Sequence, residues 1–297
     1  MNNIISERPR VALLGLGTMG LGMAGRLLGA GFKLAVFNRT AQKAEPLAAK
    51  GAQIAATPRK AATGADVIVS MVADDAVSRS LWLGKGGALS NVSPGAILIE
   101  SSTVTTSWIN ELAEAAREKG AELLDAPVTG SRTQAASGEL NFLVGGSEAA
   151  LEKARPLFAV MGRSATHVGP TGSGALLKLI NNFLCGVQAV SLAEALAVIE
   201  NAGLDGDVAT QILMNGAPGS PLLKTLSQRM TARDYTPHFH LSLMRKDLEY
   251  SLKEAKRRGV NLSTAQSALE AFERAVASGR GMQDVSAVVE PLRERTR

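Results

Sequence analysis

The residues that could do chemistry begin with a glycine-rich turn near the N-terminus. The turn directly follows the apolar run 10–14 and comprises Gly15, Leu16, Gly17, Thr18, Met19 and Gly20. In such a turn the first glycine permits a sharp bend, the second lets a phosphate approach the backbone, and the third lets the next helix pack closely on the strand. The N-terminus of that helix then offers its N–H groups to an anion. The pattern therefore predicts a binding site for the pyrophosphate of a dinucleotide.

The residues after the second apolar run discriminate between two dinucleotides. An acidic residue at this place typically holds the ribose 2′-hydroxyl of NAD, but this chain has Asn38, Arg39 and Thr40. A carboxylate would repel a 2′-phosphate, whereas Arg39 can pair with it and stack on the adenine. Asn38 and Thr40 can add hydrogen bonds to the same phosphate. The sequence therefore predicts NADP as the cofactor.

Short apolar runs alternate with helical patterns through the first half of the chain. Strands are expected at 10–14, 33–37, 66–72, 96–100, 122–126, 140–144 and 165–168. Helix caps are expected at Thr40, for a helix that ends at Gly51, and at Thr57 and Ser147. Alternating strands and helices imply βαβ units, so the predicted fold class is α/β with a parallel-rich sheet.

The pattern changes after Gly169, where no further strand is indicated. A nearly unbroken helical pattern runs from Thr171 to about Asn201, and more helices are expected at 205–215, 221–232, 243–258 and 263–278. The predicted domains are therefore a dinucleotide-binding domain at 1–169 and an all-α domain at 170–297.

Composition limits the partners of the chain. The 297 residues carry a formal charge of +5, but the basic residues are scattered, so no nucleic-acid partner is expected. A mild positive field suits an anionic cofactor and substrate. The single cysteine and the three histidines do not have the spacing of metal ligands, so no metal is expected. A single cysteine cannot form an intramolecular disulfide, which favours a reducing cytoplasm. Gln188 and Glu194 interrupt the apolar stretch 183–199, which favours a buried helix over a membrane-spanning one, so no membrane partner is expected.

Four segments together resemble the β-hydroxyacid dehydrogenase family, which includes 3-hydroxyisobutyrate dehydrogenase. They are Leu14–Gly20, Asp125–Gly138, Gly172–Asn182 and Phe239–Leu248. The resemblance covers nearly the whole chain. It implies a Rossmann-type first domain, an all-helical second domain that serves substrate binding and dimerisation, and a long helix that links them. It also implies that the protein forms a homodimer or homotetramer. It also implies hydride transfer between nicotinamide and a small carboxylate-bearing aldehyde acid or hydroxyacid, such as glyoxylate, succinic semialdehyde, tartronate semialdehyde or 3-hydroxyisobutyrate.

The resemblance assigns the catalytic role to Lys178. Leucines and an isoleucine surround this residue in the sequence, so burial is expected to lower its pKa toward the range that suits proton transfer near neutral pH. Lys178 would protonate the forming alkoxide in reduction and take the hydroxyl proton in oxidation. Asn182 lies four residues on, on the same helix face, and matches the family's substrate-positioning asparagine.

Other positions take their expected roles from the same resemblance. Thr129, Gly130 and Ser131 occupy the place of a Ser-Gly-Gly turn that binds a carboxylate, and Ser131 with Arg132 resembles most closely the glyoxylate/succinic semialdehyde reductase branch. The expected cofactor contacts are Val72, Ala73, Asp74, Thr103 and Lys246. Asp247 is expected to hold the lysine or the substrate, and Phe239 to wall the pocket.

Three alternatives stay open or are weakened by particular residues. Imine reductases on the same scaffold typically lack the lysine that this chain has at position 178. Phosphogluconate dehydrogenases carry a glutamate two turns after their lysine, where this chain has Cys185. A non-catalytic NADP-binding module is the alternative from a different functional class, and relatives of that kind have lost the lysine.

Overall fold

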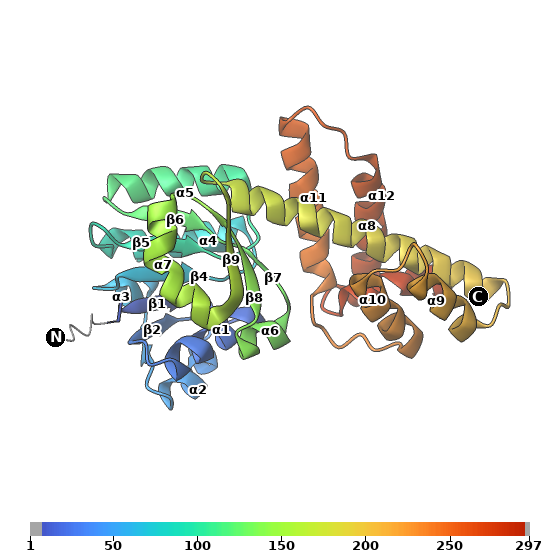
Figure 1. Cartoon of the computed structure of the whole chain (residues 1–297), viewed down its shortest axis with the longest axis horizontal. Coiled ribbons are helices and arrows are strands. Elements are labelled where there is room, and N and C mark those ends of the chain that lie inside the picture. The colour runs from blue at the N-terminus through green and yellow to red at the C-terminus, as the bar shows by residue number, and fades with distance from the viewer. Residues whose placement is uncertain (1–7, 295–297) are drawn as a thin grey trace, which may run out of the picture. The chain divides into compact units, whose positions relative to one another are not determined.

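The computed structural model describes residues 8–294, which divide into two compact units. The first unit ends at Lys178 and the second begins at Leu179, within one long helix. The first is an α/β fold of the Rossmann type and the second is helical (Figure 1).

The first unit contains a nine-stranded sheet in the order β3-β2-β1-β4-β5-β6-β8-β7, with β9 beside β8. Neighbouring strands run parallel except where β8 meets β6 and β7, so the expected parallel-rich sheet is confirmed. The strands are β1 (Val11–Leu14), β2 (Leu34–Phe37), β3 (Gln53–Ile54), β4 (Val67–Ser70), β5 (Ile97–Glu100), β6 (Glu122–Asp125), β7 (Val128–Thr129), β8 (Leu140–Gly145) and β9 (Gly162–Gly169). The two-residue strands β3 and β7 are too short to show a period, which is why the sequence did not predict them.

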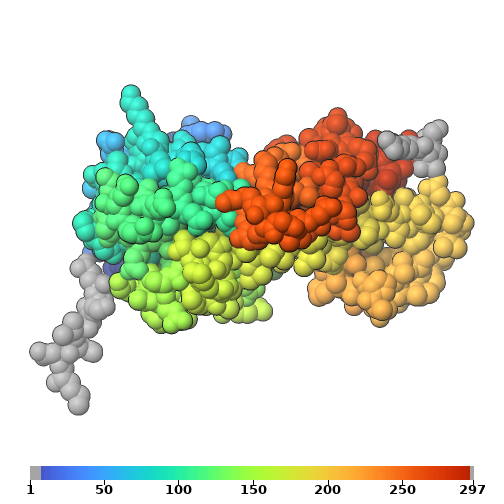
Figure 2. All heavy atoms as spheres, turned by 90° about the horizontal axis from the view of Figure 1, so that it is seen from above, coloured from blue at the N-terminus to red at the C-terminus, as the bar shows by residue number. Residues whose placement is uncertain are grey.

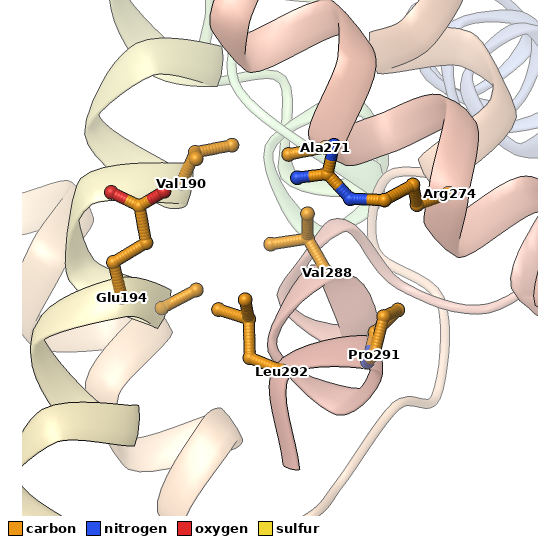
Figure 3. A pocket seen from close by; sticks show the side chains of 8 residues that line it. Val190, Glu194, Ala271, Arg274, Val288, Pro291 and Leu292 are labelled. Carbon is orange, nitrogen blue, oxygen red and sulfur yellow. The ribbon is translucent and has the colours of Figure 1, made fainter. Parts of the chain in front are cut away.

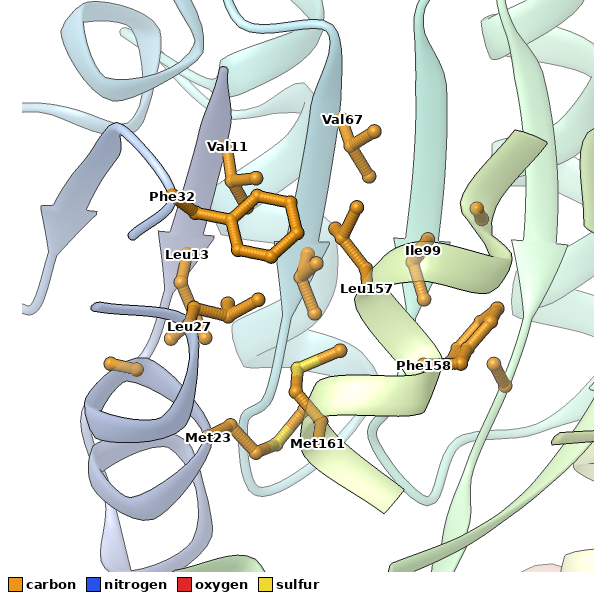
Figure 4. Close-up of a cluster of buried hydrophobic side chains, with 14 of the residues drawn as sticks. Val11, Leu13, Met23, Leu27, Phe32, Val67, Ile99, Leu157, Phe158 and Met161 are labelled. Carbon is orange, nitrogen blue, oxygen red and sulfur yellow. The ribbon is translucent and has the colours of Figure 1, made fainter. Parts of the chain in front are cut away.

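Helices cover both faces of this sheet. They are α1 (Thr18–Gly29), α2 (Glu45–Ala48), α3 (Pro58–Ala62), α4 (Asp75–Leu83), α5 (Thr106–Glu118), α6 (Arg132–Ser137) and α7 (Glu148–Met161), with 3₁₀ turns at Ala41–Ala44 and Ala88–Asn91. On one face Met23 and Leu27 of α1 face Met161 and Leu157 of α7 above the strands (Figure 4). The other face buries a separate apolar cluster that contains both tryptophans of the chain. The core of this unit therefore lies in two layers, one on each side of the sheet.

One cap prediction is wrong and two are confirmed. Thr57 and Ser147 accept the backbone N–H groups of Lys60 and Ala150, as expected. Thr40 makes no side-chain cap bond, and a 3₁₀ turn precedes a four-residue helix that begins only at Glu45. Pro46 explains the difference, because it has no N–H to bond the carbonyl four residues earlier and so prevents a regular helix from Thr40 onward.

The second unit is built from helices around one aliphatic core. They are α8 (Ser173–Asn201), which begins in the first unit, α9 (Gly206–Asn215), α10 (Pro221–Ala232), α11 (Leu241–Arg257), α12 (Ser263–Ala275) and α13 (Glu290–Glu294), with a π turn at Val276–Arg280 and a 3₁₀ turn at Val285–Val289. Leu196, Met230, Leu248 and Phe272 are buried at its centre. Among the residues described here there is no strand, only an isolated bridge between His240 and Asp284. The expected all-α character is therefore confirmed.

Candidate functional site

The glycine turn has the geometry that a dinucleotide pyrophosphate requires. Gly15 has a φ of +99°, and a Cβ there would lie 2.3 Å from the carbonyl oxygen of Met71. A Cβ on Gly20 would lie 2.0 Å from the carbonyl oxygen of Gly15. By contrast, a Cβ on Gly17 would meet nothing within 4 Å, so the backbone there is open to a ligand. Steric constraint at the first and third glycines and open space at the second fit a bound dinucleotide.

Asn38 holds this turn rather than pointing away from it. Its Oδ1 accepts the N–H of Leu16 at 2.9 Å, and its Nδ2 donates to the carbonyl of Thr40 at 2.9 Å. The oxygen and one N–H of the side-chain amide that the sequence assigns to a 2′-phosphate are therefore used within the protein. Arg39 and Thr40 are exposed beside it at the end of β2 and are available to such a phosphate.

The loops that follow β4 and β5 are tied together by hydrogen bonds. The hydroxyl of Ser102 accepts the N–H of Val72 at 2.8 Å, and Asp74 caps α4 by accepting the N–H of Val77 at 2.8 Å. Thr103 follows Ser102 and is half-buried. Because β4 lies between β1 and β5, these loops leave the same sheet edge as the glycine turn. The structure thus brings the predicted cofactor residues of this unit to one edge.

The Thr129-Gly130-Ser131 turn is held mainly by its own helix. Gly130 has a φ of +115°, and Ser131 begins α6 with a capping box. Both the N–H and the hydroxyl of Ser131 bond the Oε1 of Gln134, at 2.9 and 2.6 Å. A substrate carboxylate would therefore have to compete with Gln134 for these donors. The prediction that this turn binds a carboxylate stays a prediction.

Asp125 anchors the start of the long helix. It ends β6, is fully buried, and accepts the N–H groups of Gly172 at 2.7 Å and Ala175 at 2.8 Å. Burial raises the pKa of Asp125 to about 6, and the backbone hydrogen bonds oppose this rise. Lys178 lies one turn beyond Ala175 on α8 and is half-buried. The end of β6 therefore fixes the helix turn that precedes Lys178.

The second unit gathers three of the predicted site residues in a buried cluster. The Nδ2 of Asn182 donates to the Oδ2 of Asp247 at 2.6 Å. The Oδ1 of Asp247 lies 3.0 Å from the Nζ of Lys246, which also lies 5.0 Å from the ring centroid of Tyr250. Asn182, Asp247 and Lys246 are all at most 9% exposed. Asp247 thus holds the predicted substrate-positioning asparagine, an arrangement that the sequence did not suggest.

Phe239 is placed by a second buried carboxylate. Asp284 accepts the N–H groups of His238 at 2.8 Å and Phe239 at 3.2 Å and pairs with the Nε of Arg229 at 3.2 Å. Phe239 packs against the core of the helical unit and is half-buried. Within residues 8–294 no group of three or more metal-ligating side chains comes together.

A shallow pocket of the second unit does not contain the predicted chemistry. It lies among α8, α12 and the last helical turns, and Figure 3 shows mainly aliphatic side chains around it, with Glu194 and Arg274 on opposite sides. None of the residues that line it is a predicted site residue. We therefore regard it as a packing feature of the helices.

Two family models match the chain. The model described as the NAD binding domain of 6-phosphogluconate dehydrogenase matches residues 10–169. The model described as NAD-binding of NADP-dependent 3-hydroxyisobutyrate dehydrogenase matches residues 172–292. The two matches meet near the start of α8 and together span nearly all the described residues.

Known proteins resemble the chain over nearly all of its length. The NAD-dependent L-serine dehydrogenase of Pseudomonas aeruginosa is 36% identical and is matched over 94% of this chain and 96% of its own. Glyoxylate/succinic semialdehyde reductase 1 of Arabidopsis thaliana is 34% identical and is matched over 95% of this chain and 98% of its own. The crystal structure of 3-hydroxyisobutyrate dehydrogenase from Salmonella typhimurium has a TM-score of 0.87 and 31% identity, and covers 95% of this chain and 99% of that one. The chain therefore belongs to the β-hydroxyacid dehydrogenase family of NAD(P)-dependent enzymes.

Proposed function

We propose that this enzyme uses NADP to interconvert small aldehyde acids and hydroxyacids, with Lys178 as the general acid and base. The observation that carries the proposal is the position of Lys178 on α8. The helix turn before this residue is anchored by the buried carboxylate of Asp125. Asn182 lies four residues after it and is held by the carboxylate of Asp247. Two buried carboxylates thus fix the helix before and after the lysine, as precise proton transfer requires.

The chemistry divides between the cofactor and the chain. A dinucleotide held by the glycine turn at residues 15–20 and by Arg39 would supply a hydride for the carbonyl carbon of the substrate. In our proposal the ammonium of Lys178 donates a proton to the carbonyl oxygen, which becomes the hydroxyl, and the neutral amine then regains a proton from water. Asn182 donates or accepts a hydrogen bond that orients the substrate. In the oxidative direction the amine of Lys178 takes the hydroxyl proton.

The preference for NADP rests on the end of β2. Arg39 is exposed there, and no acidic side chain occupies positions 38–40. A carboxylate at this place would favour a free 2′-hydroxyl, whereas a guanidinium favours a phosphate. One relative is named as NAD-dependent, so the preference has to be measured with both dinucleotides.

The substrate class rests on the turn at residues 129–131 and on the relatives. The names of two relatives specify L-serine and glyoxylate or succinic semialdehyde, which are small molecules that carry a carboxylate. Gly130 and the hydroxyls of Thr129 and Ser131 are the chain's own candidates for binding that carboxylate. We therefore propose aldehyde acids and β-hydroxyacids of a few carbons, acted on by a homo-oligomeric enzyme in the cytoplasm.

A substrate screen tests the proposal. NADPH and NADH oxidation would be followed with glyoxylate, succinic semialdehyde and tartronate semialdehyde, and NADP⁺ and NAD⁺ reduction with 3-hydroxyisobutyrate and L-serine. Turnover of at least one of these acids, with NADP(H) preferred, is the expected result. Turnover only with cyclic imines would favour an imine reductase. Dinucleotide binding without any turnover on either panel would favour a non-catalytic binding module.

A further inference from the structure

A buried carboxylate lies at the end of β5, beneath the loops that carry predicted cofactor residues. Glu100 is fully buried, and its Oε1 accepts the N–H of Ser102 at 2.9 Å. Its Oε2 accepts the indole N–H of Trp82 at 2.9 Å and the hydroxyl of Ser78. All three contacts come from donors, and a carboxylate, which only accepts, satisfies the three together.

Ser102 extends this constraint to the neighbouring loop. Its N–H is held by Glu100, and its hydroxyl accepts the N–H of Val72 at 2.8 Å. A second tie joins the same two loops, because the carboxylate of Asp75 accepts the N–H and the hydroxyl of Thr105 at 2.9 and 2.5 Å. The position of the loop after β4 therefore depends on a side chain that belongs to the loop after β5.

We propose that Glu100 and Ser102 form a relay that positions both loops for the dinucleotide. We call it the Glu100–Ser102 relay. Val72 lies in the loop after β4, and Thr103 directly follows Ser102, so the relay sets the spacing between two predicted cofactor contacts. Neither relay residue has to touch the ligand, so both are positioning residues. The cofactor part of this inference rests on the proposed function.

Substituting glutamine for Glu100 would disturb the relay without changing its volume. An amide has one accepting oxygen and one NH₂ donor, so it cannot accept from both ends. If the oxygen stays with Ser78 and Trp82, the NH₂ faces the N–H of Ser102 and that hydrogen bond is lost. Glu100→Gln is therefore expected to resemble Ser102→Ala. Both tryptophans belong to the network, because Trp108 donates to Ser78 at 2.8 Å, so their emission reports on it directly.

The decisive comparison is between Ser102→Ala and Ser101→Ala. Both serines are 1% exposed and adjacent in the chain, but within the described residues the Ser101 hydroxyl has no hydrogen-bond partner. Hydrogen exchange of residues 71–75 would be measured in the ligand-free chain, and the Kd for NADPH by tryptophan fluorescence. We expect Ser102→Ala to speed exchange and raise the Kd about 2- to 12-fold, the equivalent of one hydrogen bond. The KM for the aldehyde acid at saturating NADPH should stay unchanged.

Each outcome decides a separate part of the inference. Equal exchange in the Ser101→Ala and Ser102→Ala variants would overturn the relay. Faster exchange in Ser102→Ala with an unchanged Kd would overturn its role in cofactor binding. If the wild-type chain bound neither NADPH nor NADH, the proposed function would fail, while the exchange comparison would still decide whether the relay holds the loops.

Discussion

At the scale of single residues, the environment of Lys178 differs from the one that its sequence neighbours suggest. Leu179 is buried, but Leu177 and Ile180 are 38% and 44% exposed. The apolar residues around the lysine therefore do not all enclose it, because they point to different sides of α8. What the chain does provide is a fixed backbone, through Asp125 on one side and Asn182 on the other.

Replacing Lys178 with alanine should lower turnover and leave dinucleotide affinity intact. Loss of general acid catalysis is worth roughly 10²- to 10⁴-fold in kcat. The measurements are kcat with the substrate that gives the fastest turnover in the screen, and the Kd for NADPH. Lys224→Ala is the matched control, because Lys224 is an exposed lysine on α10. Wild-type turnover in the Lys178 variant would exclude this residue from the mechanism.

Replacing Arg39 with alanine should weaken the binding of NADPH more than the binding of NADH. A charge-assisted hydrogen bond contributes about 1.5–3 kcal/mol, so the Kd for NADPH should rise roughly 10- to 100-fold while that for NADH changes little. Lys50→Ala removes another exposed cation near the end of the following helix and serves as control. An equal loss for both dinucleotides would refute contact between Arg39 and a 2′-phosphate.

At the scale of elements, the start of α8 depends on a carboxylate from another element. The end of β6 supplies Asp125, and close packing brings the two together: a Cβ on Gly174 would lie 2.5 Å from the carbonyl oxygen of Asp125. Gly22 has the same role between α1 and α6, since a Cβ there would lie 2.8 Å from the carbonyl carbon of Ala135. Such close approaches make these helices sensitive to substitution at the small residues.

The raised pKa of Asp125 should appear in the pH dependence of stability. The folded chain binds this proton up to about pH 6, whereas an unfolded aspartate releases it near 3.8. The folded state is therefore favoured at low pH, and this contribution of roughly 3 kcal/mol is lost as the pH rises from 4 to 7. Chemical denaturation of wild type and Asp125→Asn across this range would measure it, since only the wild type has the titration. Parallel stability curves for the two proteins would contradict the prediction.

At the scale of the whole molecule, α8 and α9 carry several large apolar side chains that are exposed among the described residues. Among the described helices α8 is long and apolar enough to cross a membrane by length and composition, and 44% of its most apolar window is buried. On α9, Val208 and Ile212 lie four residues apart and are 52% and 67% exposed. The gold and yellow atoms in Figure 2 show these helices at the surface of the second unit. We propose that a second copy of the chain covers the α9 face formed by Val208 and Ile212.

A charge on the α9 face should weaken this assembly. We expect light scattering to give a dimer or tetramer for the wild type and a shift toward monomer for Ile212→Asp. Val260→Asp is the control, because Val260 is 53% exposed but lies after α11. A monomeric wild type, or an Ile212→Asp variant that assembles normally, would show that this face is not an interface between copies.

The sequence alone was enough to predict the longer strands and helices and the glycine turn. The strand–helix alternation, the all-α second half and Gly15, Gly17 and Gly20 are local patterns, and hydrophobic period and backbone sterics act over a few residues. The sequence-based prediction was wrong at Thr40, because Pro46 prevents the regular helix that Thr40 was predicted to cap. The family pattern also supplied Lys178 and Asn182, but not what holds them.

Only the tertiary structure determined which polar groups meet. Asn38 bonds a residue 22 positions away, Ser102 one 30 away, Asp125 one 47 away and Asn182 one 65 away. A hydrogen bond between distant residues leaves no period in the sequence, because it depends on which strand ends and helix faces packing brings together. The sequence therefore allows chemical roles to be proposed for these residues, whereas the buried partners that orient them appear only in the tertiary structure.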